Sequence, residues 1–98
     1  MRAIRIYHIK QFYQDGSFIE VKIWKVPKSE DKPHGFKYSF VYVKDGKRVV
    51  GYDNGEQKGD QRHYGAKEVP YSYDDIDKLW DDFMHDIDQL RKEASHEG

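Results

Sequence analysis

The sequence predicts an α+β fold, with a four-stranded antiparallel β-meander followed by one C-terminal amphipathic helix that packs on one face of the sheet. Two observations support this prediction. Runs rich in β-branched and aromatic residues alternate with turn signals over the first half of the chain. The last quarter instead repeats apolar residues at intervals of three and four. With 98 residues the chain has the length of a single domain, 1–98, that can bury a core without disulfides.

The first two strands are expected at residues 2–13 and 17–26. The first run contains neither Gly nor Pro, which favours a strand. Asp15-Gly16 suits a tight hairpin, because both central residues of such a turn take positive φ. Along the second run apolar residues alternate with charged ones, which indicates a half-buried strand that ends at Pro27.

The third and fourth strands are expected at residues 36–44 and 47–53, and Asp45-Gly46 repeats the hairpin signal between them. Short loops throughout imply antiparallel pairing, since parallel strands need long crossovers. Four aromatic residues share one face of the third strand: Phe36, Tyr38, Phe40 and Tyr42. A row of this kind usually fills a core. The alternative is an exposed platform on which nucleic-acid bases stack.

A polar segment with four glycines follows at residues 50–65, and we expect it to be irregular and to carry the functional groups. Residues 66–73 are expected to form an extended linker, because Pro70 disfavours helix before it. The helix is expected at about 74–93, with aspartates at its positive end. One apolar stripe would dock it on the sheet: Ile76, Leu79, Trp80, Phe83, Ile87 and Leu90.

The net charge of −1 is divided unevenly along the chain. Residues 1–73 carry 14 Lys and Arg against 9 Asp and Glu, whereas residues 74–98 carry 3 against 9. A basic body can bind a polyanion. An acidic helix can bind a basic partner, or its acidic residues can simply form the face that is exposed to solvent. There is no cysteine, no apolar run near the roughly 20 residues of a membrane span and no apolar leader. We therefore expect a cytoplasmic protein without membrane contact.

The polar segment holds the residue types that cutting a phosphodiester requires. His63 suits proton transfer, because the ordinary pKa of imidazole lies near about 6.5, and Asp60 would orient it. Lys58 and Arg62 would neutralise the charge that develops on phosphorus. Neighbours in an extended segment point opposite ways, so Arg62 and His63 would need a bent backbone to converge.

Two other interpretations stay open for the same segment. Asp53, Asp60 and His63 supply donors for Mg²⁺ or Mn²⁺, but their spacing matches no specific metal-binding pattern, so we expect no cofactor. Nucleotide-binding and nucleophile motifs are absent from the sequence. The second interpretation is that the segment belongs to a non-catalytic module and binds nucleic acid or a partner protein.

The stretch GYDNGEQKGDQRHYG, followed by AKEVPYSY and an acidic amphipathic helix, resembles the TumE family of small bacterial and archaeal toxin-antitoxin proteins. The resemblance extends upstream through DGSFIEVKIWKVP and FKYSFVYVKDGKRVV, and so covers nearly the whole chain. It implies the toxin of a type II-like module, paired with a helix-turn-helix antitoxin encoded beside it, with RNA binding and RNA cleavage as the suspected activity. Exposed sheet edges would also allow a homodimer.

The resemblance singles out residues of the polar segment: Tyr52, Asp53, Asn54, Lys58, Gly59, Asp60, Arg62 and His63. The predicted site therefore has two parts, with His63, Asp60 and Arg62 for catalysis and Lys58, Tyr52, Asp53, Asn54 and Tyr64 for substrate binding. One departure matters, because the family pattern often has a histidine where this chain has Gln61, which is no acid or base at neutral pH. The acidic helix would face the antitoxin, or shield the basic sheet, with Asp81, Asp82, Asp86 and Asp88.

Overall fold

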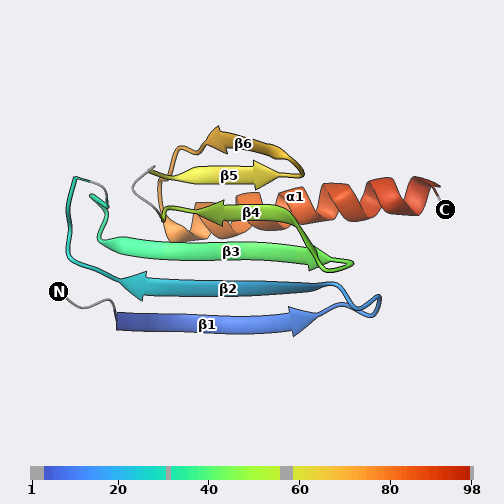
Figure 1. Ribbon diagram of the computed structural model, residues 1–98, viewed down its shortest axis with the longest axis horizontal. Helices are drawn as coiled ribbons and strands as arrows, with labels where there is room; N and C mark the ends of the chain where they lie inside the picture. Colours follow the sequence, from blue (N-terminus) through green and yellow to red (C-terminus); the bar gives the residue numbers. More distant parts are fainter. Residues whose placement is uncertain (1–3, 31, 56–58, 98) are drawn as a thin grey trace.

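The computed structural model describes residues 4–30, 32–55 and 59–97, with side chains up to residue 93. These residues form six strands and one helix (Figure 1). In chain order they are β1 (Ile4–Phe12), β2 (Phe18–Lys25), β3 (Phe36–Lys44), β4 (Lys47–Asp53), β5 (Gln61–Tyr64), β6 (Lys67–Pro70) and α1 (Ile76–Glu97). The helix in this part of the chain is too polar to be a membrane span.

The strands form one antiparallel meander in the order β1-β2-β3-β4-β5-β6, and α1 lies against one of its faces (Figure 1). This arrangement confirms the α+β class and the C-terminal helix. The predicted number of strands was wrong, because β5 and β6 lie where an irregular segment and a linker were expected. The sheet therefore continues two strands beyond β4 within the described residues.

Both additional strands are short and lack the apolar alternation that reveals a strand in sequence. Gly65 turns between them with φ 61°, a conformation that favours glycine. Its N–H donates to the Val49 carbonyl at 2.9 Å, which fastens the turn to β4. Pro70 lacks an N–H and is tolerated in β6 because that strand is at the edge of the sheet.

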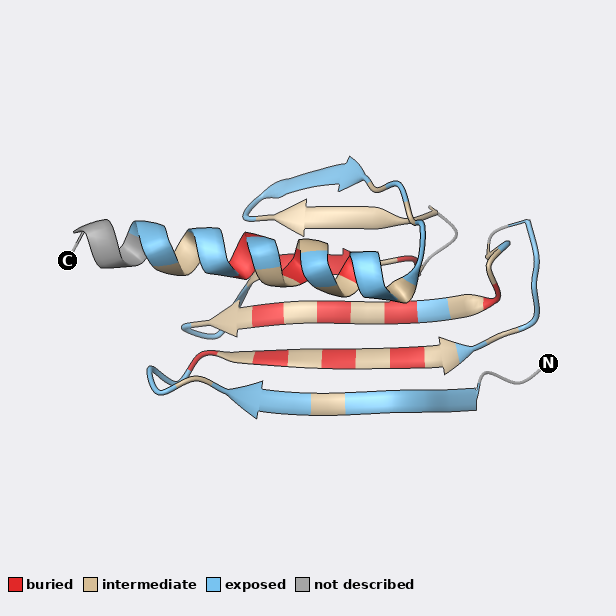
Figure 2. Ribbon diagram, turned by 180° about the vertical axis from the view of Figure 1, so that it is seen from behind, coloured by how far each residue is buried: buried red, intermediate tan, exposed pale blue. Residues whose placement is uncertain are grey.

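The core lies between α1 and the inner residues of the central strands. Burial alternates along β2 and β3, as a strand covered on one face requires (Figure 2). The aromatic row of β3 belongs to this core, so its expected core role is confirmed and it forms no exposed stacking platform. The buried apolar residues are Ile19, Val21, Ile23, Tyr38, Phe40, Tyr42, Val50, Tyr52, Leu79, Phe83 and Ile87.

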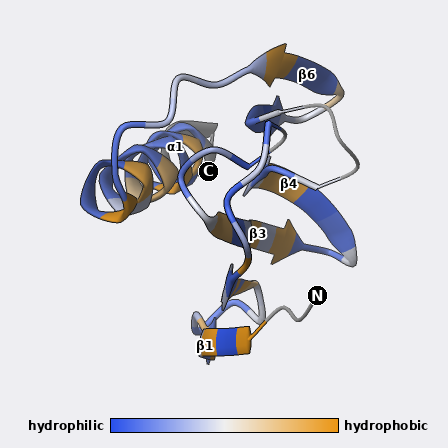
Figure 3. Ribbon diagram, turned by 90° about the vertical axis from the view of Figure 1, so that its left-hand side faces the viewer, coloured by the Kyte–Doolittle hydropathy of each residue, from blue (hydrophilic) through white to orange (hydrophobic). Residues whose placement is uncertain are grey.

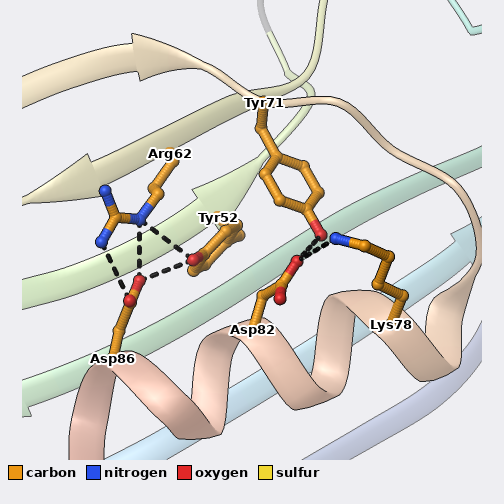
Figure 4. Close-up of polar contacts among 6 residues, drawn as sticks. All are labelled: Tyr52, Arg62, Tyr71, Lys78, Asp82 and Asp86. Carbon is orange, nitrogen blue, oxygen red and sulfur yellow. Dashed lines mark hydrogen bonds and ion pairs between the residues drawn. The ribbon is translucent and has the colours of Figure 1, made fainter. Parts of the chain in front are cut away.

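Polar contacts also hold the helix on the sheet (Figure 4). The hydroxyls of Tyr52 and Tyr71 donate to Asp86 and Asp82 of α1, each at 2.5 Å. Arg62 donates from Nε and Nη2 to the two carboxylate oxygens of Asp86, at 2.8 and 2.9 Å. Asp82 and Asp86 were expected either to face the antitoxin or to shield the basic sheet. Both carboxylates point toward the sheet and hold the helix there, which agrees with the second alternative and not with the first.

We expect the stability of the fold to fall in alkaline solution through Tyr52. Burial, and then the hydrogen bond to Asp86, raise the pKa of this hydroxyl above its ordinary value. A tyrosine whose pKa is raised in the folded state contributes fully to the free energy of unfolding at pH values below its unfolded-state pKa of about 10. That contribution is lost as the pH rises toward the folded-state pKa. Urea unfolding between pH 8 and 11 should show a decline of up to about 1.4 kcal/mol per pH unit from this group.

Tyr52→Phe should flatten this decline, because the titrating hydroxyl is gone. Tyr7→Phe is the matched control, since it removes the hydroxyl of a tyrosine that is exposed on β1. Equal slopes in the parent and in Tyr52→Phe would show that the alkaline loss arises elsewhere.

Candidate functional site

The sheet face opposite α1 carries a polar hollow with a volume of about 510 Å³. Figure 3 shows α1 on one side of the sheet, which leaves the other side without a covering helix. Every strand from β2 to β6 contributes to the hollow. Its lining consists of Trp24, Lys37, Tyr38, Ser39, Arg48, Asp53, Gly55, Gln61, His63 and Glu68.

A histidine and a carboxylate form a pair in this hollow. The His63 Nε2 lies 3.0 Å from the Asp53 Oδ2. The two side chains share a face because His63 pairs with Gly51 and Asp53 pairs with Gln61 across β4 and β5. His63 is 13% exposed and Asp53 is 32% exposed, so solvent and a ligand reach the pair from the hollow. With its Nε2 proton donated to the carboxylate, the neutral imidazole can accept a proton at Nδ1.

Asp60 does not form the pair that was expected with His63. Its Oδ2 accepts a hydrogen bond from the Tyr38 hydroxyl at 2.5 Å and lies 3.3 Å from the His34 Nε2. The reason is the strand geometry of β5, in which alternate residues face opposite sides of the sheet. Asp60, immediately before the strand, and Arg62 therefore contact groups on the α1 side, while His63 faces the hollow.

Arg62 is likewise separated from His63, because β5 is a regularly paired strand in which neighbouring side chains face opposite sides of the sheet. Its guanidinium binds Asp86 and lies 4.9 Å from the centre of the Tyr64 ring. Tyr52 is buried beneath the same group. These three predicted residues thus occupy the helix side of the sheet, where Arg62 and Tyr52 hold α1 in place.

Asn54 is buried and links the ends of two strands. Its Nδ2 donates to the Phe36 carbonyl at 2.7 Å, and its Oδ1 accepts from the Tyr38 N–H at 3.0 Å. Lys58 lies outside the described residues. Among the predicted residues that are described, His63 and Asp53 line the hollow, and they are joined there by Gln61.

The alternative of a metal site required the side chains of Asp53, Asp60 and His63 to surround one metal ion. Asp60 contacts Tyr38 and His34 on the other side of the sheet from the pair. Within the described ranges, no group of three or more His, Cys, Asp or Glu residues is placed to hold a metal ion. These three residues therefore do not form the Mg²⁺ or Mn²⁺ site that was left open as an alternative.

Arg48 enters the hollow because of a β-bulge, which sequence reasoning missed. Tyr42 pairs with Val50 and Val43 pairs with Arg48, so β4 has one extra residue, Val49, between them. Strict alternation from Val50 would have turned Arg48 toward α1, and the bulge instead aims it at the open face. The two adjacent valines do not reveal this bulge, because β3 also has adjacent apolar residues and pairs with β2 without one.

Gly51 gives the Arg48 side chain room to cross the sheet. A Cβ at Gly51 would lie 2.9 Å from the Arg48 Cδ, closer than such atoms pack. Gly51 pairs with His63, so the space above Gly51 lies beside the histidine. The aliphatic part of the Arg48 side chain runs through this space. The absence of a side chain at Gly51 therefore helps to place a cation beside the pair.

Trp24 and Lys37 form the β2 side of the hollow and were also missed. They pair across β2 and β3, and the Lys37 Nζ lies 5.3 Å from the centre of the Trp24 ring. An aromatic face beside positive charge is the combination that binds single-stranded nucleic acid through stacking. A sequence signal was present, because Trp24, like Phe18, shares the parity of Glu20 and Lys22 in β2.

A protein-family model described as Toxin TumE matches residues 2–91 of the chain. The matched range includes all strands of the described sheet and most of α1, and therefore the hollow and the contacts that hold the helix. Comparisons with curated proteins and with solved structures gave no match.

Proposed function

The chain belongs to the TumE toxin family, and from this premise we propose that it is a toxin that cleaves RNA in the hollow on the open face of its sheet. The observation that supports cleavage is the His63–Asp53 pair, set in a hollow that also holds Arg48 and Lys37. The family implies an antitoxin partner. In this proposal the partner is a helix-turn-helix antitoxin, and the toxin acts on cytoplasmic RNA.

The reaction proposed is transfer of a phosphodiester to the neighbouring ribose hydroxyl. His63 takes the proton from the 2′-OH, whose oxygen attacks the adjacent phosphorus. The bond from phosphorus to the 5′ oxygen breaks, and the leaving oxygen takes a proton from water in the open hollow. The products are a 2′,3′-cyclic phosphate and a 5′-OH, and no metal ion takes part in the step.

The remaining groups of the hollow have supporting roles in this reaction. Asp53 holds the imidazole in one tautomer and orientation, as carboxylates do for catalytic histidines. Arg48 and Lys37 offset the negative charge that grows on the phosphoryl oxygens. Trp24 stacks on a neighbouring base, which positions the strand without reading its sequence. The substrate class is therefore single-stranded RNA.

The test is induction of the protein in a bacterial host, with growth and total RNA followed together. We expect growth arrest with RNA fragments that end in cyclic phosphate. The purified protein should cut a single-stranded RNA equally with and without EDTA, and should bind but not cut the same oligonucleotide with 2′-deoxyribose. Arrest without fragments would instead support the non-catalytic module. Cleavage that EDTA abolishes would contradict the metal-free step.

Gly51→Ala should weaken RNA binding while leaving the fold intact. The backbone of Gly51 is in an ordinary strand conformation, so alanine is tolerated there, but its Cβ displaces the Arg48 stem. Loss of a charge-assisted contact in Arg48→Ala should raise the Kd for a labelled RNA about tenfold, and Gly51→Ala should show part of that loss.

Binding is best measured by fluorescence anisotropy at fixed salt in a His63→Ala background, so that the RNA stays uncut. Lys47→Ala is the matched control, because it removes an exposed cation from the same hairpin outside the hollow. If Lys47→Ala and Arg48→Ala weakened binding equally, the effect would be general charge rather than a contact in the hollow.

A further inference from the structure

The α1 side of the sheet is open near β1, where the helix does not cover it. A groove of about 460 Å³ runs there between β1 and α1. Ile6 and Tyr7 of β1 form one wall, Ile76 and Trp80 of α1 form the other, and the core residue Phe40 lies at the floor. The apolar core of the protein is thus accessible from this side.

A second β-bulge gives the β1 wall its apolar character. Arg5 pairs with Trp24 and Tyr7 pairs with Ile23, so Ile6 is the extra residue. The bulge brings two consecutive apolar side chains, Ile6 and Tyr7, to the groove. They are 53% and 44% exposed, which is costly for apolar residues of this size unless something covers them.

The α1 wall adds negative charge to the groove. Asp77 lines the groove, and Asp81 follows one turn later on the same flank of the helix. Neither carboxylate has an ion pair within the described residues, whereas Asp82, Asp86 and Asp88 of the same helix each have one. An apolar groove with an unneutralised acidic rim is complementary to an apolar segment that also carries Lys or Arg.

The groove is continuous with the free edge of the sheet. Among the described strands, β1 has a neighbour on one side only, so the outer N–H and C=O groups of its backbone are available to a further strand. A protein segment can pair with this edge and place its apolar side chains in the groove. Neither feature suits RNA, because the rim is acidic and the walls are apolar.

We propose that this groove and the edge of β1 bind the antitoxin, through a segment that is apolar on one side and basic on the other. The proposal rests on the toxin assignment above but not on the cleavage chemistry. A second copy of the chain fits less well, because pairing two β1 edges would bring Arg5, His8 and Lys10 of both copies together.

The groove and the hollow lie on opposite faces of the sheet, and their lining residues do not overlap. The antitoxin is therefore held by residues that take no part in RNA cleavage. A toxin without activity should bind it as tightly as the active one. This separation allows the docking site to be tested in a His63→Ala background, where the toxin can be produced safely.

The probe is the purified helix-turn-helix antitoxin of the proposed function, titrated onto the full-length His63→Ala protein. Adding Ile6→Glu should raise the Kd at least about 30-fold, as expected for a central apolar contact. Adding Asp77→Lys should raise it about tenfold and reduce the salt dependence of binding. Circular dichroism melts establish that each variant is folded.

Phe12→Glu is the matched control for Ile6→Glu. Phe12 is 65% exposed on the same strand, but it packs on Phe18 on the open face of the sheet. Its replacement should leave the Kd within about twofold, inside the usual scatter for a surface change. Equal losses in both variants, or no loss in either, would overturn the proposal. So would an Ile6→Glu variant that turns a dimer into a monomer in light scattering while its antitoxin affinity is unchanged.

Discussion

Replacing His63 with alanine should lower the rate of RNA cleavage by orders of magnitude and leave the fold intact. The side chain lines the hollow, pairs there with Asp53 and is not one of the buried core residues, so the core loses nothing. General acid–base groups contribute about 10²- to 10⁴-fold to a rate, and we expect a loss in that range. The measurement is the initial rate on a single-stranded RNA at substrate concentrations below KM, with urea unfolding of the same preparation.

Two further variants show whether such a loss belongs to the pair. Asp53→Asn should keep RNA binding but lower the cleavage rate, because the amide supports the imidazole without stabilising its charged form. His85→Ala removes an exposed histidine of α1 on the far side of the sheet and should cut RNA at the parental rate. A fully active His63→Ala protein would remove the histidine from the mechanism.

Arg62→Ala should lower the stability of the protein rather than the chemistry of cleavage. It leaves the Asp86 carboxylate, whose side chain is 9% exposed, with the Tyr52 hydroxyl but without its cation. Loss of one partner from a fully buried pair costs about 3–5 kcal/mol, and the 33% exposure of the arginine side chain reduces this to about 2–3 kcal/mol. Urea unfolding at pH 7 measures the change.

Arg48→Ala is the informative comparison for Arg62→Ala, because the two arginines lie on opposite faces of one sheet. The exposed Arg48 should change the free energy of unfolding by less than about 0.5 kcal/mol while weakening RNA binding. Arg62→Ala should do the reverse when assayed at a temperature where it is fully folded. Loss of cleavage in a stable Arg62→Ala protein would restore the phosphate-clamping role that the sequence suggested.

The sequence predicts the part of the fold in which one face of each strand is apolar. Burial alternates clearly along β2 and β3, and the stripe of α1 has one matching sheet face to cover. This reasoning does not detect β5, because both faces of that strand carry polar side chains that make contacts. His63 and Gln61 face the hollow while Arg62 contacts the helix, so the strand is polar throughout.

The site was predicted in part, for a related reason. Which residues meet depends on the face that each one occupies, and a face can be assigned only once the segment is known to be a strand. His63 was therefore found, but Asp60 was chosen as its partner in place of Asp53. Arg48 was missed because a bulge changes the parity of β4. Trp24 was missed because the aromatic row of β3, which is buried, was the feature considered for base stacking.

The bulge at Val49 also determines where the β3–β4 hairpin tolerates a change in length. A bulge absorbs one residue without altering the pairing on either side of it, so losing Val49 would still leave Arg48 opposite Val43. An insertion or deletion between Gly51 and Asp53 would instead exchange the two faces of the strand end and turn the carboxylate away from His63. Loop grafts and chain-length variants of this domain can therefore be made on the hairpin side of Val50, while the residues after it must keep their spacing.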